Sequence, residues 1–114
     1  MTICRLGADA EAPPWAMQGR FWCVTRTADE LSVVCEEEAA PAGVSQECGW
    51  GILKVHGPLD FALTGVLSNL TSILAAVGIA VFALSTFDTD YLLVKHEKMD
   101  TAVAALRDGG HTFA

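Results

Sequence analysis

Cysteine and histidine are the residues of this chain best suited to metal binding or covalent catalysis, so their spacing is considered first. A structural zinc site needs closely spaced ligand pairs. The four cysteines form no CxxC pair, and they lie at Cys4, Cys23, Cys35 and Cys48. The three histidines add no ligand at short helical spacing, and they lie at His56, His96 and His111. We therefore expect no metal site, and we interpret the cysteines as small buried apolar residues in a reducing compartment.

The sequence also lacks the motifs that identify a catalytic nucleophile or a cofactor site. It contains no GxSxG, no P-loop, no GxGxxG and no cysteine with a suitably placed histidine. The acidic run at residues 36–38 is better interpreted as a solvated loop or a frayed helix start than as a metal site, because no second ligand cluster lies nearby. We therefore expect a protein that is not an enzyme and that uses no cofactor.

Composition narrows the possible partners and the location. The chain has 114 residues, 52% of them hydrophobic and 18% charged, which is enough apolar surface for a folded protein. Its net charge of -7, without any basic run, repels phosphate backbones, so we expect no nucleic-acid partner. Residues 1–10 lack the basic and then apolar layout of a signal peptide, so the expected location is the cytoplasm.

One uncharged segment, residues 61–87, is long enough to cross a bilayer. Its small polar residues gather on one helical face, and its flanks are Asp60 and Asp88 without any lysine or arginine cluster. Gly78 also divides it into a helical half and a half with the pattern of a strand. We therefore expect two elements of a globular unit and no membrane span.

The pattern of residues 50–114 predicts the element order β-α-β-β-α-β. The expected strands are 51–56, 79–87, 90–95 and a terminal edge strand at 111–114, and the expected helices are 62–77 and 96–108. Gly78 should end the first helix, which carries one apolar stripe formed by Leu63, Val66, Leu67, Leu70, Ile73, Leu74 and Val77. Two right-handed crossovers then place both helices on one face of a four-stranded antiparallel sheet, an α+β, ferredoxin-like fold.

The hairpin at 79–95 is apolar on both faces. With Phe87 opposite Asp90, Leu84 pairs with Leu93 on one face, and Ala83 pairs with Val94 on the other. A helix layer covers only one face, so the other face or the sheet edge should meet another sheet or another chain. We therefore expect two sheets in tandem and a homodimer.

Residues 1–49 resemble a shortened copy of the same plan. Strands are expected at 2–6, 21–26 and 31–34, with a polar turn between the last two. Residues 8–18 contain Pro13 and Pro14, which permit at most a turn or two of helix beginning at the prolines. The predicted organisation is therefore a reduced unit at 1–49 and a complete unit at 50–114.

Three segments of the second unit resemble the ACT domains of the aspartate kinase and CASTOR type, in particular small bacterial proteins built from two such domains. They are residues 57–67, which include Thr64-Gly65, residues 78–79, and residues 84–94 with the turn Ser85-Thr86-Phe87-x-x-Asp90. The resemblance covers 50–114 well, and 20–35 is the most typical part of the first unit. It implies a regulatory or sensing module of ACT fold that binds a small ligand, usually an amino acid, at an interface between units.

The resemblance also implies which residues form the site. The ligand would lie between the start of the 62–77 helix and the 86–90 turn, which we expect to approach one another only across a domain or subunit interface. Backbone N–H groups at a helix N-terminus suit an α-carboxylate, and an aspartate suits the ammonium group. The predicted ligand-binding residues are Asp60, Phe61, Thr64, Gly65, Val66, Thr86, Phe87 and Asp90.

Two observations leave alternatives open. Leu63 stands where the arginine-sensing CASTOR proteins have an acid, so a basic ligand side chain is less well matched here. Asp88 and Asp90 could be ordinary turn residues, Thr64-Gly65 a simple helix start, and Phe87 a core residue. The alternative function is therefore an ACT-type assembly module that binds no ligand.

Overall fold

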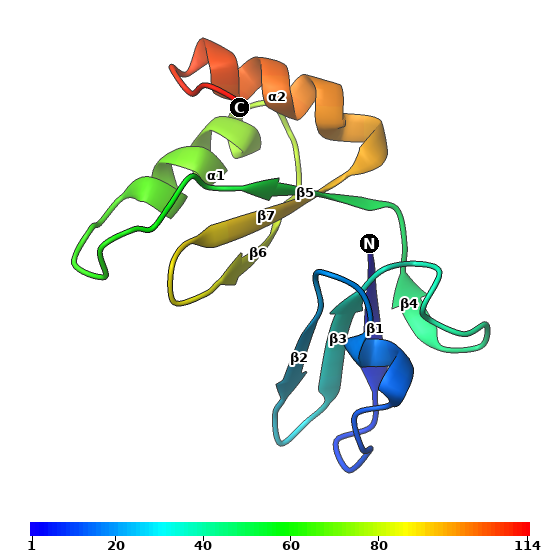
Figure 1. Cartoon of the computed structure of the whole chain (residues 1–114). Helices are drawn as coiled ribbons and strands as arrows, with labels where there is room; N and C mark the ends of the chain where they lie inside the picture. The colour runs from blue at the N-terminus through cyan, green and yellow to red at the C-terminus, as the bar shows by residue number, and fades with distance from the viewer. The chain divides into compact units, whose positions relative to one another are not determined.

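The computed structural model describes residues 1–114, which form two compact units, Met1–Gly49 and Trp50–Ala114. Each unit contains one antiparallel sheet, and both helices of the chain belong to the second unit (Figure 1). The chain is thus of mixed α+β class, compatible with the ACT and ferredoxin-like fold. That the first unit is itself a reduced ACT unit stays a prediction.

The first unit contains β1 (Thr2–Leu6), β2 (Cys23–Arg26), β3 (Leu31–Cys35) and β4 (Ser45–Glu47), in the sheet order β2-β3-β1-β4. Its one helical element is the 3-10 turn η1 (Pro14–Met17), which begins at the prolines as expected. The strand β4 is absent from the predicted elements, because its three residues are polar and show no apolar alternation.

Two of the four cysteines are core residues of this first unit. Cys4 and Cys35 are buried with Ala16 and Val33, and Trp15 packs against this cluster. Cys48 is exposed and Cys23 is half-buried, so the interpretation of all four as buried residues is wrong for these two. Cys48 lies just beyond β4, at the edge of the sheet, where its thiol contacts Thr2 and Gln46.

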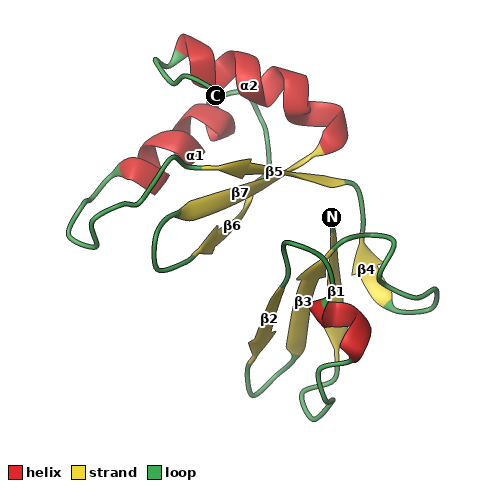
Figure 2. Ribbon diagram, in the orientation of Figure 1, coloured by secondary structure: helices red, strands yellow, loops and turns green.

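The second unit contains β5 (Trp50–Lys54), α1 (Val66–Ala76), β6 (Phe82–Ser85), β7 (Asp90–Lys95) and α2 (Met99–Asp108), with the 3-10 turn η2 (His96–Lys98) leading into α2. Its sheet order is β5-β7-β6, so α1 connects two parallel strands on either side of β7 (Figure 2). The helices pack on one face of the sheet, where Leu70 and Leu74 of α1 meet Leu92 and Val94 of β7.

The helix α1 is shorter than the predicted 62–77 segment. Five residues of the predicted stripe pack in the core, but Leu63 and Val77 lie outside the helix and are 54% and 47% exposed. Gly65 has a φ of 83° and precedes the first helical turn. Gly78 has a φ of 76°, and the N–H groups of Gly78 and Ile79 close the helix end on Ala75 and Leu74. The expectation that Gly78 ends the helix is therefore confirmed.

The β6–β7 hairpin has a register other than the predicted one. Leu84 pairs with Tyr91 and Phe82 pairs with Leu93, because the N–H of Thr86 donates to the carbonyl of Thr89 and closes the turn one residue earlier than expected. The shift changes each partner by two residues, so every side chain stays on its predicted face.

The expected terminal strand at 111–114 is absent. The backbone N–H of His111 donates to Leu106, and its side chain is hydrogen-bonded to Asn69 of α1, so the segment stays beside the helices. Neither helix of the chain has the length and apolar character that a membrane crossing requires.

Candidate functional site

A cavity of about 270 Å³ lies in the second unit, where two of the predicted binding segments meet. One wall comes from residues between Leu59 and Ser68, and the other from residues between Ser85 and Asp90. Seven of the eight predicted residues line it: Asp60, Phe61, Gly65, Val66, Thr86, Phe87 and Asp90. Thr64 is not among the lining residues.

The two walls meet within a single unit because of the strand directions. β5 is antiparallel to β7, so the segment that leaves β5 lies at the same end of the sheet as the turn that enters β7. The N–H of Leu59 donates to the carbonyl of Asp88 at 2.6 Å, and the hydroxyl of Thr89 donates to the carbonyl of Val55 at 2.7 Å. The expectation that these segments approach only across a domain or subunit interface is therefore wrong.

The first turn of α1 faces the cavity with unused backbone donors. The first intrahelical hydrogen bond runs from the N–H of Asn69 to the carbonyl of Gly65, so the N–H groups of residues 66–68 precede it. The helix has no side-chain cap and no acidic residue in its first turn. The positive end of the helix dipole is thus open to an anionic group.

Gly65 is required by its left-handed backbone. A Cβ at this position would meet no atom within 4 Å, so close approach of a neighbour does not explain the glycine. The φ of 83° explains the glycine, because residues with a Cβ adopt this backbone angle only with strain.

Three carboxylates line the cavity, and no lysine, arginine or histidine does. Asp60 accepts a hydrogen bond from the N–H of Ala62 at 2.7 Å, and Asp90 accepts one from the hydroxyl of Ser85 at 2.6 Å. Each bond uses one carboxylate oxygen and fixes the side chain. Asp88 is the third carboxylate. It lies with Asp90 on the wall opposite the helix N-terminus, whereas Asp60 lies on the same wall as the helix, and the negative charge of these groups attracts an ammonium group.

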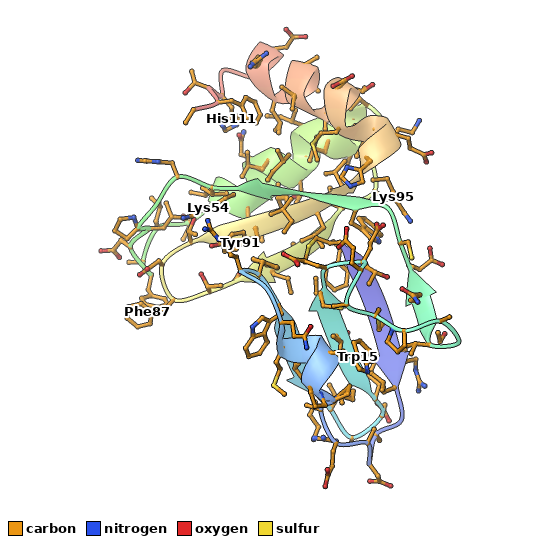
Figure 3. All side chains as sticks on the ribbon, turned by 45° about the vertical axis from the view of Figure 1, so that its right-hand side comes forward. Trp15, Lys54, Phe87, Tyr91, Lys95 and His111 are labelled. Carbon is orange, nitrogen blue, oxygen red and sulfur yellow. The ribbon has the colours of Figure 1, made fainter.

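Two aromatic rings stand at the mouth of the cavity. The rings of Phe61 and Phe87 pack edge to face, with centroids 4.9 Å apart at 82°. They are 74% and 79% exposed, and Phe87 extends from the turn away from the ribbon (Figure 3). The alternative interpretation of Phe87 as a core residue is therefore wrong.

Sequence reasoning missed four polar residues of this cavity, namely Ser68, Ser85, Asp88 and Thr89. Asp88 is outside the predicted set, and an ordinary turn residue is one alternative interpretation of it. Its neighbours Thr86 and Thr89 give the turn its geometry. Thr86 and Thr89 close the turn on each other, and Thr89 is 4% exposed. The signal available in the sequence was the density of hydroxyl and carboxylate residues at 85–90.

The histidine, cysteine and acidic side chains also bear on metal binding and thiol reactivity. No group of three or more His, Cys, Asp or Glu side chains is placed to hold a metal ion. Burial raises the pKa of the Cys35 thiol to about 11, and it raises the pKa of Cys4 as well. Both thiols are therefore protonated at neutral pH, which is the unreactive form.

Comparison with known families bears on both units. A family model described as an ACT domain matches residues 45–108, and a model of an N-terminal domain matches residues 1–43. No curated protein matches the chain. The match supports an ACT domain, and it does not support the narrower assignment to the aspartate kinase and CASTOR type.

Two solved structures share the fold over nearly the whole chain. A crystal structure of a protein from Agobacterium tumefaciens is 39% identical, with a TM-score of 0.93 over 99% of this chain and 84% of that one. A Vibrio cholerae protein of unknown function, described as a possible transport protein, is 19% identical, with a TM-score of 0.74 over 94% of this chain and 82% of that one. The second likeness concerns the fold alone.

Proposed function

Since the chain belongs to the ACT domain family, we propose that it is a regulatory or sensing module that binds an amino acid and has no catalytic activity of its own. ACT domains are regulatory ligand-binding modules, and the cavity of the second unit supplies a site for such a ligand. The observation that carries the proposal is the convergence of the α1 N-terminus with three aspartates around one cavity. We further propose that the protein is a cytoplasmic homodimer and that its second unit is an ACT domain of the aspartate kinase and CASTOR type.

The two ends of an amino acid match the two kinds of charged group that line the cavity. Its α-carboxylate would accept hydrogen bonds from the N–H groups at the start of α1, among them the predicted donor Val66. Its ammonium group would donate to Asp90 or Asp60, each held in place by a hydrogen bond within its own segment. The presence of these carboxylates together with free helix N–H groups favours a zwitterion over a plain anion.

The ligand side chain would extend toward the mouth of the cavity. Phe61 and Phe87 supply apolar ring surface there, and Leu63 is exposed beside them. These residues fit an apolar or aromatic side chain. The alternative, an assembly module without a ligand, leaves this exposed ring pair as the contact surface for a protein partner.

The test is a thermal-shift screen of the twenty amino acids, followed by calorimetry on each one that raises the melting temperature. A ligand present at about 100 times its Kd adds about 2.7 kcal/mol to the unfolding free energy. Asp90→Asn keeps an oxygen for the Ser85 hydroxyl and removes only the charge, so binding should weaken about tenfold to a hundredfold. Asp108→Asn, at the exposed end of α2, is the matched control and should bind like the wild type.

Each result has a defined meaning. Equal affinity of the Asp90→Asn variant and the wild type would remove Asp90 from the site. The absence of any stabilising amino acid would contradict the proposal and favour the assembly module.

A further inference from the structure

The β6–β7 turn presents an exposed aromatic residue and an exposed acidic residue next to each other in the chain. Phe87 and Asp88 are both exposed, and the Phe87 side chain points away from the ribbon (Figure 3). Phe61, which packs against Phe87, and Leu63 are exposed as well and extend the apolar surface. Exposed apolar surface with a rim of charged residues is typical of a contact site for another molecule.

The turn holds its two central residues in a defined position. The N–H of Thr86 donates to the carbonyl of Thr89 at 2.8 Å, and the N–H of Thr89 donates to the hydroxyl of Thr86 at 3.4 Å. The carbonyl of Asp88 accepts the N–H of Leu59, so the turn is also tied to the neighbouring segment. Little backbone freedom remains to be lost when a partner binds, which favours affinity.

The carboxylate of Asp88 is the one acidic group at this turn that the chain itself does not use. Asp60 and Asp90 each accept a hydrogen bond within their own segment. The Asp88 carboxylate takes part in no hydrogen bond or ion pair with the rest of the chain. No lysine, arginine or histidine lines the adjoining cavity. The turn therefore has an unbalanced negative charge directly beside an aromatic ring.

We propose that this surface binds an arginine-bearing, apolar segment of another protein. The guanidinium would stack on the ring of Phe87 and pair with Asp88, and the apolar neighbours of the arginine would contact Phe61 and Leu63. Arginine suits such a site because its planar group stacks on an aromatic face while it donates hydrogen bonds to a carboxylate.

An arginine–phenylalanine contact of this kind already exists within the chain. The guanidinium carbon of Arg107 lies 5.3 Å from the centroid of the Phe113 ring. This separation is within the range in which a cation is attracted to the ring face. The Phe87 site would offer the same ring face together with a carboxylate.

Charge argues against other occupants of this surface. The chain has a net charge of -7, so a second copy would bring further negative charge to these carboxylates. Nucleic acids and anionic membranes are repelled in the same way. A basic segment of a different protein is attracted by the charge and retained by the apolar surface. The inference does not depend on whether the cavity binds an amino acid.

The probe is a short capped peptide in which arginine and leucine alternate, added to the isotope-labelled full chain in the absence of amino acids. We expect saturable changes in the backbone amide signals of residues 61–63 and 86–89, with the signals of the first unit unchanged. One control peptide has glutamate in place of arginine, and another has serine in place of leucine. Both should bind at least about tenfold more weakly than the probe.

Two variants and two matched controls locate the contact. Phe87→Ala removes the ring, and Asp88→Asn removes the charge but keeps the shape of the side chain. Each should weaken binding of the arginine peptide about tenfold. Trp22→Ala and Asp108→Asn change an exposed ring and an exposed carboxylate elsewhere, and both should bind like the wild type. All four positions are exposed, so native circular dichroism spectra are expected.

Three results with the peptides would overturn the proposal. They are unchanged amide signals with the arginine peptide, equal affinity for the glutamate peptide, and an affinity that neither Phe87→Ala nor Asp88→Asn changes. Sedimentation without peptide tests the remaining occupant, because self-association that Phe87→Ala abolishes would place a second copy at this surface and contradict the inference. If a variant does not fold, the amide changes in the wild type decide the question alone.

Discussion

Replacing Gly78 by alanine tests the account of how α1 ends. Gly78 has a φ of 76°, and a Cβ built there meets no atom within 4 Å. The substitution therefore adds backbone strain without a steric clash. The left-handed conformation costs an L-residue about 1–2 kcal/mol, and the smaller freedom of alanine in the unfolded chain returns about 0.4–1 kcal/mol. The expected net loss is on the order of 1 kcal/mol.

Urea unfolding monitored by circular dichroism measures this loss, with an unchanged m-value showing that the unfolded state is the same. Gly78→Asn is the control at the same position, because asparagine tolerates the left-handed region better and should lose less than alanine. Gly7→Ala is the control for adding a methyl group, since Gly7 has no positive φ and a Cβ there also meets open space. It should leave the stability unchanged or raise it slightly.

A stability of Gly78→Ala equal to or above the wild type would refute the reasoning. It would mean that residue 78 has ordinary helical dihedral angles, and α1 would then continue toward Phe82. The hydrogen bonds from Gly78 and Ile79 to the end of α1 would be absent in that case.

Two further predictions concern the cores of the two units. Leu74→Ala should lower the unfolding free energy by about 3 kcal/mol, because Leu74 is fully buried. Leu63→Ala, at a 54% exposed position, should change it by less than about 0.5 kcal/mol. Equal losses for the two variants in urea unfolding would contradict the assigned core. Burial raises the pKa of Cys35 from 9.0 to about 11, so between these pH values the unfolded chain releases this proton first and the unfolding free energy falls as pH rises. Cys35→Ala should reduce that fall by about 2–3 kcal/mol, and parallel curves for variant and wild type would show that the thiol is not shifted.

Periodicity was sufficient to predict α1, α2 and the hairpin of the second unit. A helix that buries one stripe repeats every three to four residues, and this pattern survives whatever the tertiary contacts are. It could not fix the start of α1, because Leu63 continues the stripe although the left-handed Gly65 follows it. The register of the hairpin depended on which of two adjacent residue pairs closes the turn, and only the Thr86–Thr89 bond decides this.

Short elements without hydrophobic periodicity could not be predicted from the sequence. The strand β4 has three residues and is defined by its pairing with β1, which is distant along the chain. At the other end, 111–114 has a strand-like composition, but the contacts of His111 with Leu106 and Asn69 hold it beside the helices. In both cases long-range partners decide the structure.

Seven of the eight site residues implied by the family resemblance line one cavity, because they belong to two short segments, a helix start and a turn, whereas Thr64 does not line it. That they bind a ligand stays a prediction. Their convergence in one unit was not predicted, although it follows from the topology. In the order β5-β7-β6 the end of β5 and the start of β7 are neighbours, so the next loop and the turn must meet. The main-chain bond from Leu59 to Asp88 and the buried hydroxyl of Thr89 then fix their separation. In the proposed function, these hydrogen bonds preorganise the groups that would hold a ligand's charged ends. Selectivity among ligand side chains would then depend on the exposed rings of Phe61 and Phe87.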